Sequence, residues 1–163
     1  MPSRTAPGPD QESVWDYPRP PRLERTDRHL QVIFDGVLLA DTTAAYRVLE
    51  TSHPPTYYLP PDDIAMEHLQ QTGQRTLCEF KGQAVYYDVA VGEARAEAAA
   101  WAYPNPRPRF QDIAGYVSFY AHRMDRCVVD GEDVAPQEGS FYGGWITSDV
   151  VGPFKGGPGT RGW

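Results

Sequence analysis

Residues 30–40 read Leu-Gln-Val-Ile-Phe-Asp-Gly-Val-Leu-Leu-Ala, two apolar runs separated by an Asp-Gly pair. Asp-Gly between two such runs is a strong signal of a two-residue β-hairpin, because both turn residues need a positive φ. A second Asp-Gly pair stands at residues 130–131. Residues 83–91 place Val85, Tyr87, Val89 and Val91 on one face of an extended chain, which is the period of a strand. The sequence therefore predicts a mostly β protein built from antiparallel hairpins.

Other segments extend this pattern. Strands are expected at 46–50, 74–80 and 83–91, and residues 116–122 and 126–129 are expected to form a closing strand pair. Two short helices are expected. The first spans 61–71, with Asp62 and Asp63 in its first turn and Gly73 near its end, and the second is a turn or two within the Ala- and Glu-rich residues 93–100. The chain has 16 prolines and 15 glycines in 163 residues, which disfavours long helices.

The composition divides the chain into three parts. Residues 1–28 form a proline-rich N-terminal arm that cannot bury enough apolar surface to fold alone. Residues 29–135 form a single β domain. Residues 136–163, rich in glycine and aromatic residues, form a C-terminal arm that we expect to be ordered and packed on the domain. The terminal arms are also candidates for a homodimer contact.

Charge and cysteine content restrict the partners. The formal net charge is −7, so a nucleic-acid partner would meet long-range repulsion, and neither nucleic acid nor membrane is expected to bind. No apolar run approaches the about 20 residues of a membrane helix. Cys78 and Cys127 lie far apart without a Cys-x-x-Cys companion, which favours a reducing, cytoplasmic location and no metal or other cofactor. Cys78 is expected to be a buried structural thiol on the strand face opposite Lys81.

The lysines stand out from the other basic residues. Two of the 15 lysines and arginines are lysine, and both stand in the same tripeptide, Phe80-Lys81-Gly82 and Phe154-Lys155-Gly156. A lysine kept in an arginine-rich chain can mark a place that needs a compact ammonium group, although two cases are also compatible with chance.

Several motifs resemble one known family, the domain of unknown function 427 family. They are Thr-Leu-Cys-Glu-Phe-Lys-Gly-Gln-Ala-Val-Tyr-Tyr-Asp-Val (76–89), Ala-Ala-Trp-Ala-Tyr-Pro-Asn-Pro (99–106) and Ile-Ala-Gly-Tyr-Val-Ser-Phe-Tyr (113–120). Residues 52–60, 142–147 and 152–160 resemble its longer bacterial members. The resemblance covers nearly the whole chain from Glu12 onward.

The resemblance implies a fold more than a function. It implies a small antiparallel barrel or sandwich similar to the β-tent group, which includes methionine sulfoxide reductase B-type enzymes and the ligand-binding domain of cereblon. Those relatives hold a structural zinc with two Cys-x-x-Cys pairs, which this sequence lacks, so no zinc is expected. A nucleotidyltransferase label is sometimes attached to the family, but the Gly-Ser and paired acidic residues of that chemistry are not found here. Function has to be argued from the site.

Lys81 is the first candidate site residue. A lysine among aromatic side chains can form a Schiff base, act as a base, or bind a carboxylate or phosphate while protonated. His53 and Asp88 are candidates for proton transfer beside it. The structural alternatives are a turn lysine paired with Glu79 or Asp88, and a histidine that only caps the chain before Pro54.

An aromatic cage is the second candidate. Tyr57, Tyr86, Trp101 and Tyr103 are predicted to contact a ligand, with Glu79 beside them, because aromatic rings with a polar tip make good pocket walls. Core packing is the alternative for many of these rings. Tyr86 and Tyr87 point to opposite faces of one strand, so at most one of them shares a pocket with Lys81.

Two function hypotheses follow. The first is a small-molecule-binding protein that acts as an enzyme on a carbonyl-bearing or anionic metabolite through a pocket around Lys81. The second is a non-catalytic module that uses the same aromatic cage to bind a small ligand or a modified peptide. The sequence does not decide whether the protein is an enzyme.

Overall fold

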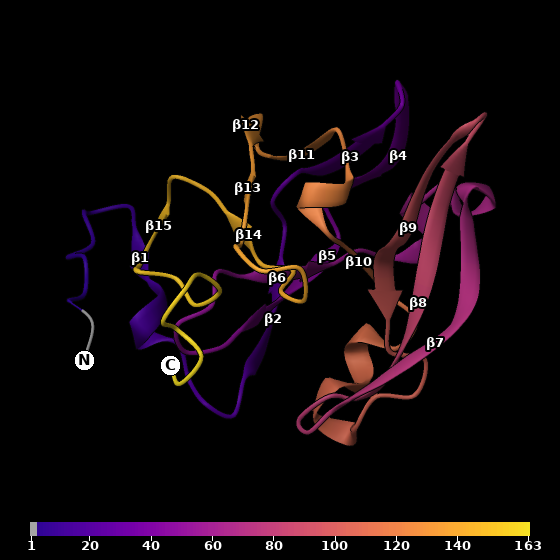
Figure 1. Ribbon diagram of the computed structural model, residues 1–163. Coiled ribbons are helices and arrows are strands. Elements are labelled where there is room, and N and C mark those ends of the chain that lie inside the picture. Colours follow the sequence, from indigo (N-terminus) through magenta and orange to yellow (C-terminus); the bar gives the residue numbers. More distant parts are fainter. Residues whose placement is uncertain (1–2) are drawn as a thin grey trace.

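Three antiparallel sheets carry the fold of residues 3–163, which the computed structural model describes (Figure 1). The first has the order β12-β11-β3-β4, formed by Glu132–Asp133, Arg126–Val129, Leu30–Phe34 and Val37–Thr42. The second has the order β10-β9-β8-β7, formed by Val117–Phe119, Ala94–Ala102, Gly82–Val91 and Leu69–Cys78. The third has the order β2-β5-β6, formed by Arg22–Thr26, Ala45–Leu49 and Thr56–Tyr58.

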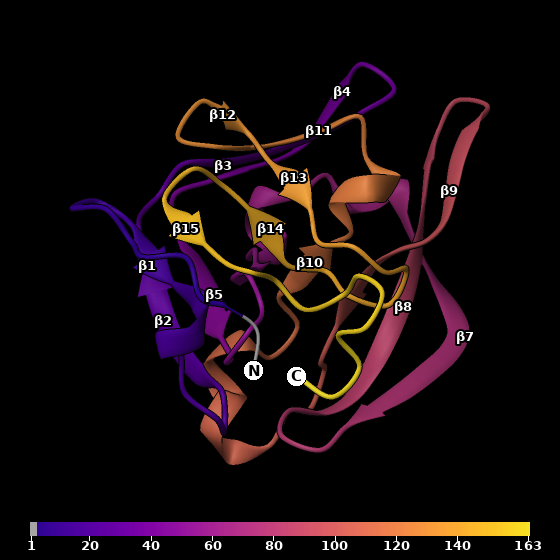
Figure 2. The same cartoon turned by 60° about the vertical axis from the view of Figure 1, so that its left-hand side comes forward.

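Short elements connect the sheets. Strand β1 (Glu12–Ser13) pairs in parallel with β15 (Val150–Val151), and β13 (Ala135–Pro136) pairs with β14 (Trp145–Ile146). The helical elements of residues 3–163 are 3₁₀ turns: η1 (Val14–Asp16), η2 (Pro61–Asp63), η3 (Met66–His68), η4 (Pro108–Ile113) and η5 (Ala121–Arg123). Both predicted arms therefore contain strands that pair with the rest of the chain. Figure 2 shows the yellow C-terminal segment running from β15 toward the β7–β8 side of the molecule.

The two Asp-Gly pairs form the predicted turns. Asp35 and Gly36 have φ values of 49° and 78° and connect β3 to β4, while Asp130 and Gly131 have φ values of 49° and 81° and connect β11 to β12. Two successive positive φ values give the turn the same twist as its strands, and Asp and Gly tolerate them well. The hairpin predicted at residues 30–40 is confirmed, and the second Asp-Gly pair forms a turn of the same kind.

Lys81 lies in the turn of the longest hairpin. Strands β7 and β8 pair from Leu69 with Val89 to Cys78 with Gly82. The backbone oxygen of Lys81 accepts a hydrogen bond from the amide of Arg107 at 2.9 Å, which ties the turn to the Pro-rich segment after β9. The strands predicted at 74–80 and 83–91 are thus confirmed, as is the strand predicted at 46–50.

The helix predicted at 61–71 is wrong. Residues 61–68 form the two 3₁₀ turns η2 and η3, and β7 already begins at Leu69. The amide of Ala65 donates to the oxygen of Leu39 at 2.8 Å, and Leu69 pairs with Val89. Bonds to neighbouring strands satisfy backbone groups that a helix would pair internally, so tertiary contacts override local propensity.

The helical turn predicted within 93–100 is also wrong. These residues form β9, which pairs with β8 on one side and β10 on the other. Ala99 and Ala100 are fully buried there, so the small side chains fit a crowded central strand. Burial and strand pairing outweigh the helix propensity of alanine.

The predicted closing pair forms as two separate strands. Strand β10 pairs with β9, whereas β11 pairs with β3 and β12, so the two belong to different sheets. Apolar patterning identified each strand but carried no information on its partner.

The core lies between the sheets. One cluster includes Leu30, Val89, Phe119 and Trp145, and a second includes Tyr58, Trp101, Tyr103 and Phe110. The mostly β prediction is confirmed. The sheets pack in a sandwich-like manner, and within residues 3–163 they close no barrel. No helix in the described part of the chain has the length and apolar character needed to cross a membrane.

Candidate functional site

A pocket of about 320 Å³ lies beside the Lys81 turn, and we call it the Lys81 pocket. Strands β7, β8 and β9 with the residues that directly follow β7 and β9 form one part of its lining, and the segment from residue 50 to 58 forms another. Tyr120 and the C-terminal arm supply the rest. The lining residues are Glu50, His53, Thr56, Tyr58, Thr76, Leu77, Cys78, Lys81, Tyr86, Trp101, Tyr103, Tyr120, Gln137, Phe141, Tyr142, Gly143 and Lys155.

Five of the eight predicted site residues line this pocket. They are Lys81, His53, Tyr86, Trp101 and Tyr103. Tyr86 lines it while Tyr87 packs against the other core cluster, as the alternation of β8 requires.

The other three predicted site residues lie elsewhere. Asp88 accepts hydrogen bonds from Arg95 Nη2 at 2.5 Å and from the amide of Ala98 at 2.8 Å. Tyr57 is buried in the core, with its ring centroid 5.3 Å from that of Trp145. Glu79 is exposed in the hairpin turn. None of them lines the Lys81 pocket.

Aromatic rings form the pocket wall. The ring centroids of Trp101 and Tyr120 are 4.5 Å apart, and Trp101 Nε1 donates to the Tyr58 hydroxyl at 3.4 Å. The hydroxyls of Tyr86 and Thr76 are 2.8 Å apart and share a hydrogen bond. Burial raises the pKa of Tyr58, Tyr103 and Tyr120. Their hydroxyls therefore stay protonated and can each donate a hydrogen bond.

His53 is uncharged at neutral pH. Burial lowers its pKa to about 4; the positive charges of Lys155, Arg19 and Lys81 act in the same direction, and Glu50 opposes them. Glu50 itself lies 3.5 Å from Arg19. The His53 ring packs 5.5 Å, centroid to centroid, from that of Tyr142.

Lys155, on the C-terminal arm, also lines the pocket. Its ammonium group donates to the backbone oxygen of Trp163 at 3.3 Å and lies 5.9 Å from the centre of the Tyr142 ring. Both lysines of the chain therefore line one pocket. The repeated Phe-Lys-Gly tripeptide marked both lysines in the sequence, but the repeat alone does not predict that the two copies lie close together in space.

Cys78 also differs from its prediction. It is half-buried and lines the Lys81 pocket together with Lys81. Strand alternation was extended from Cys78 to Lys81, but β7 ends at Cys78 and the chain turns before β8 begins at Gly82. The alternation of side chains along β7 therefore cannot predict the direction of the Lys81 side chain.

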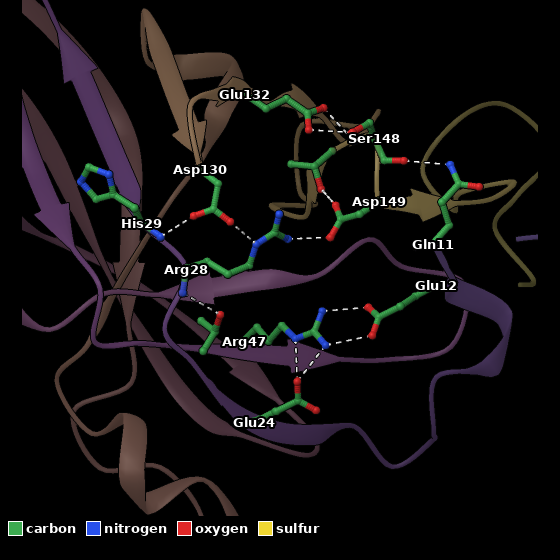
Figure 3. Close-up of polar contacts among 12 residues, drawn as sticks. Gln11, Glu12, Glu24, Arg28, His29, Arg47, Asp130, Glu132, Ser148 and Asp149 are labelled. Atoms are coloured by element: carbon green, nitrogen blue, oxygen red, sulfur yellow. Dashed lines mark hydrogen bonds and ion pairs between the residues drawn. The ribbon is translucent and has the colours of Figure 1, made fainter. Parts of the chain in front are cut away.

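A larger cavity of about 610 Å³ lies on another part of the molecule and is lined mainly by charged residues. Figure 3 shows that two of its arginines, Arg28 and Arg47, are already paired. Arg47 donates to both carboxylate oxygens of Glu12, at 2.9 and 3.1 Å, and to Glu24 at 2.7 Å. Arg28 bridges Asp130 and Asp149 at 2.9 and 2.6 Å.

These ion pairs explain how the terminal arms are held. Glu12 belongs to β1, Asp149 directly precedes β15, and Arg47 lies on β5 of the domain. Hydrogen bonds from Arg47 lower the pKa of Glu12, and those from Arg28 lower the pKa of Asp130. Because the charges satisfy one another, we interpret the arginine network of Arg28 and Arg47 as a structural clamp.

The described residues contain no group of three His, Cys, Asp or Glu side chains placed to hold a metal ion. Residues 22–130 match the family described as Domain of unknown function (DUF427). This match covers more than half of the chain, so the protein belongs to that family. A comparison with curated proteins finds no match. The match ends before residues 137–155, which complete the Lys81 pocket.

Proposed function

We propose that this protein binds a small ligand in the Lys81 pocket, and that the ligand combines a flat apolar part with an anionic or carbonyl group. The observation that carries the proposal is the position of the lysines. The chain has two, and both line the pocket, although its formal net charge is −7. A locally positive, partly desolvated pocket attracts an anion that the rest of the protein surface repels.

The walls support the flat part of the ligand. Trp101, Tyr103 and Tyr120 contribute aromatic rings to the lining, and Tyr58 and Tyr86 contribute further rings. The volume of about 320 Å³ is at the lower end of the range for ligand sites, which favours a metabolite-sized molecule.

Binding without chemistry is the better supported of the two hypotheses. Asp88, the carboxylate proposed for proton transfer, is engaged by Arg95 and Ala98 and does not line the pocket. Lys81 remains the candidate for a Schiff base in the enzymatic alternative. Trapping of a carbonyl ligand by borohydride, lost in Lys81→Arg, would support that alternative.

Native mass spectrometry of the gently purified protein tests the proposal. We expect a co-purifying small molecule that is lost in Lys81→Met and weakened in Lys155→Met. Arg126→Met is the matched control, since Arg126 forms an exposed ion pair with Asp133 outside the pocket. Equal ligand retention in both lysine variants and the control would contradict the role of the lysines.

Two finer predictions accompany the proposal. Both cysteines are free, which supports a cytoplasmic location, and cell fractionation would test it. A homodimer through the terminal arms is tested by the mass of the protein in solution.

A further inference from the structure

The side chain of Gln137 connects three parts of the Lys81 pocket. It is 3% exposed. Its Oε1 accepts from the amide of Gly144 at 3.0 Å, and its Nε2 donates to the backbone oxygen of Lys155 at 2.7 Å. The same Nε2 lies 3.1 Å from Nδ1 of His53.

These contacts fix the orientation of the amide. A backbone N–H can only donate and a backbone oxygen can only accept, so Oε1 must face Gly144 and Nε2 must face Lys155. Nε2 carries two hydrogens, and the second one points to His53. Nδ1 of His53 must therefore accept, and the proton of the neutral ring must be on Nε2.

The rest of the surroundings agree with a neutral ring. Lys155, Arg19 and Lys81 oppose a charge on His53, and Glu50, which would favour one, is paired with Arg19. The backbone of Lys155 also lies close to His53 in space, because its amide donates to the oxygen of Ser52, the residue before His53, at 2.8 Å. Among the described residues, Nε2 of His53 has no hydrogen-bond partner, and His53 lines the pocket.

We infer that Gln137 is a positioning residue that holds His53 as an Nε2–H donor, so that His53 and the two lysines receive a proton-free anionic oxygen, as in a carboxylate or phosphate group. The inference rests on the proposed function and narrows its ligand class. It assigns His53 a different role from general base: a ring that already carries its proton on Nε2 has no free lone pair on that side.

Nitrogen-15 NMR of the imidazole rings tests the tautomer directly. In the full chain at neutral pH we expect His53 to show protonated Nε2 and unprotonated Nδ1. Sodium phosphate, used as the probe anion, should shift the Nε2 signal. His53→Phe keeps an aromatic ring against Tyr142 but removes the donor, and should weaken phosphate binding about 10-fold, the effect of one hydrogen bond to a charged group.

Gln137→Glu tests the positioning role. One carboxylate oxygen can still accept from Gly144, but the other can no longer donate to Nδ1 and instead accepts from it, so we expect the proton of His53 to appear on Nδ1. Gln83→Glu is the matched control, because Gln83 is exposed on β8 and this substitution adds the same charge outside the pocket. If Gln137→Glu does not fold, Gln137→Met should still give a mixture of both tautomers.

The outcomes separate the inference from the proposed function. A His53 ring protonated on Nδ1 in the wild type would overturn the inference, and so would an unchanged His53 tautomer in both Gln137 variants. Either result holds regardless of whether phosphate binds. If phosphate shifts the NMR signals of the two lysines but not that of His53 Nε2, the inference is overturned and the proposed function is kept. If neither His53 nor the lysines respond to phosphate or acetate, the assigned ligand class is overturned, and so is the anionic form of the proposed function.

Discussion

Substitution of Gly143 by alanine is the most direct test of how the C-terminal arm closes the Lys81 pocket. A Cβ atom at this position would lie 2.0 Å from Cη2 and 2.7 Å from Cζ3 of Trp101. Carbon atoms in contact are about 3.5–4.0 Å apart, so one partner has to move by roughly 1.5 Å.

The geometry indicates which partner moves. Trp101 is packed against Tyr120 and bonded through Nε1 to Tyr58, and its own strand β9 is paired on both sides. We therefore expect the segment around Gly143 to shift away from the ring. Overpacking of this kind costs about 1–3 kcal/mol. For a chain of this size that lowers Tm by about 2–4 °C per kcal/mol.

The shift should also weaken ligand binding. The neighbouring residue, Gly144, donates to Oε1 of Gln137, so moving this segment disturbs the amide that contacts His53. Thermal unfolding and titration with the co-purified ligand measure the two effects. Gly73→Ala is the control, because a Cβ there would meet nothing within 4 Å. A Gly143→Ala protein with the Tm and affinity of this control would refute the reasoning.

Three further changes test other parts of the structure. His53 has a pKa of about 4 in the folded state and 6.5 as a free side chain, so it contributes stability above pH 6.5 that is lost as pH falls toward 4, about 3 kcal/mol in all. Urea unfolding should therefore show that the free energy of unfolding of His53→Gln depends less on pH over this range than that of the wild type. Parallel pH curves for the two proteins would exclude the effect. Arg47→Met removes the bonds to Glu12 and Glu24 and should cost about 2 kcal/mol, seen as a lower urea midpoint, with an unchanged midpoint arguing against a clamp. Ser52 has a φ of 72° and a buried hydroxyl without a partner in residues 3–163, so Ser52→Gly should raise the free energy of unfolding by about 1 kcal/mol, and a loss of stability would show that its hydroxyl is needed.

Local chemistry explains which parts of the fold could be predicted. The Asp-Gly turns need two positive φ values, and the alternation of β8 sets its two faces, so both are encoded in a few adjacent residues. The alanines of β9 and the acidic residues at 62–63 also carry local preferences, but there the preferences point to a helix. Pairing with neighbouring strands decided these segments, and that pairing joins residues far apart in the sequence.

The same distinction applies to the Lys81 pocket. Tyr86 and Trp101 pair with each other on β8 and β9, and Lys81 lies in the turn that leads into β8, so their proximity follows once these strand pairings are known. Gln137 and Lys155 reach the site only because the C-terminal arm crosses the domain. No local pattern marks Gln137, whose role depends on Gly144, Lys155 and His53 lying around it.

The late position of these residues in the chain has a consequence for biosynthesis. Residues 22–130, which match the family, emerge from the ribosome before Gln137 and Lys155. The aromatic wall can therefore be in place while its second lysine and the partner of His53 have yet to be translated. A nascent chain should acquire its full ligand affinity only after residue 155 has left the exit tunnel.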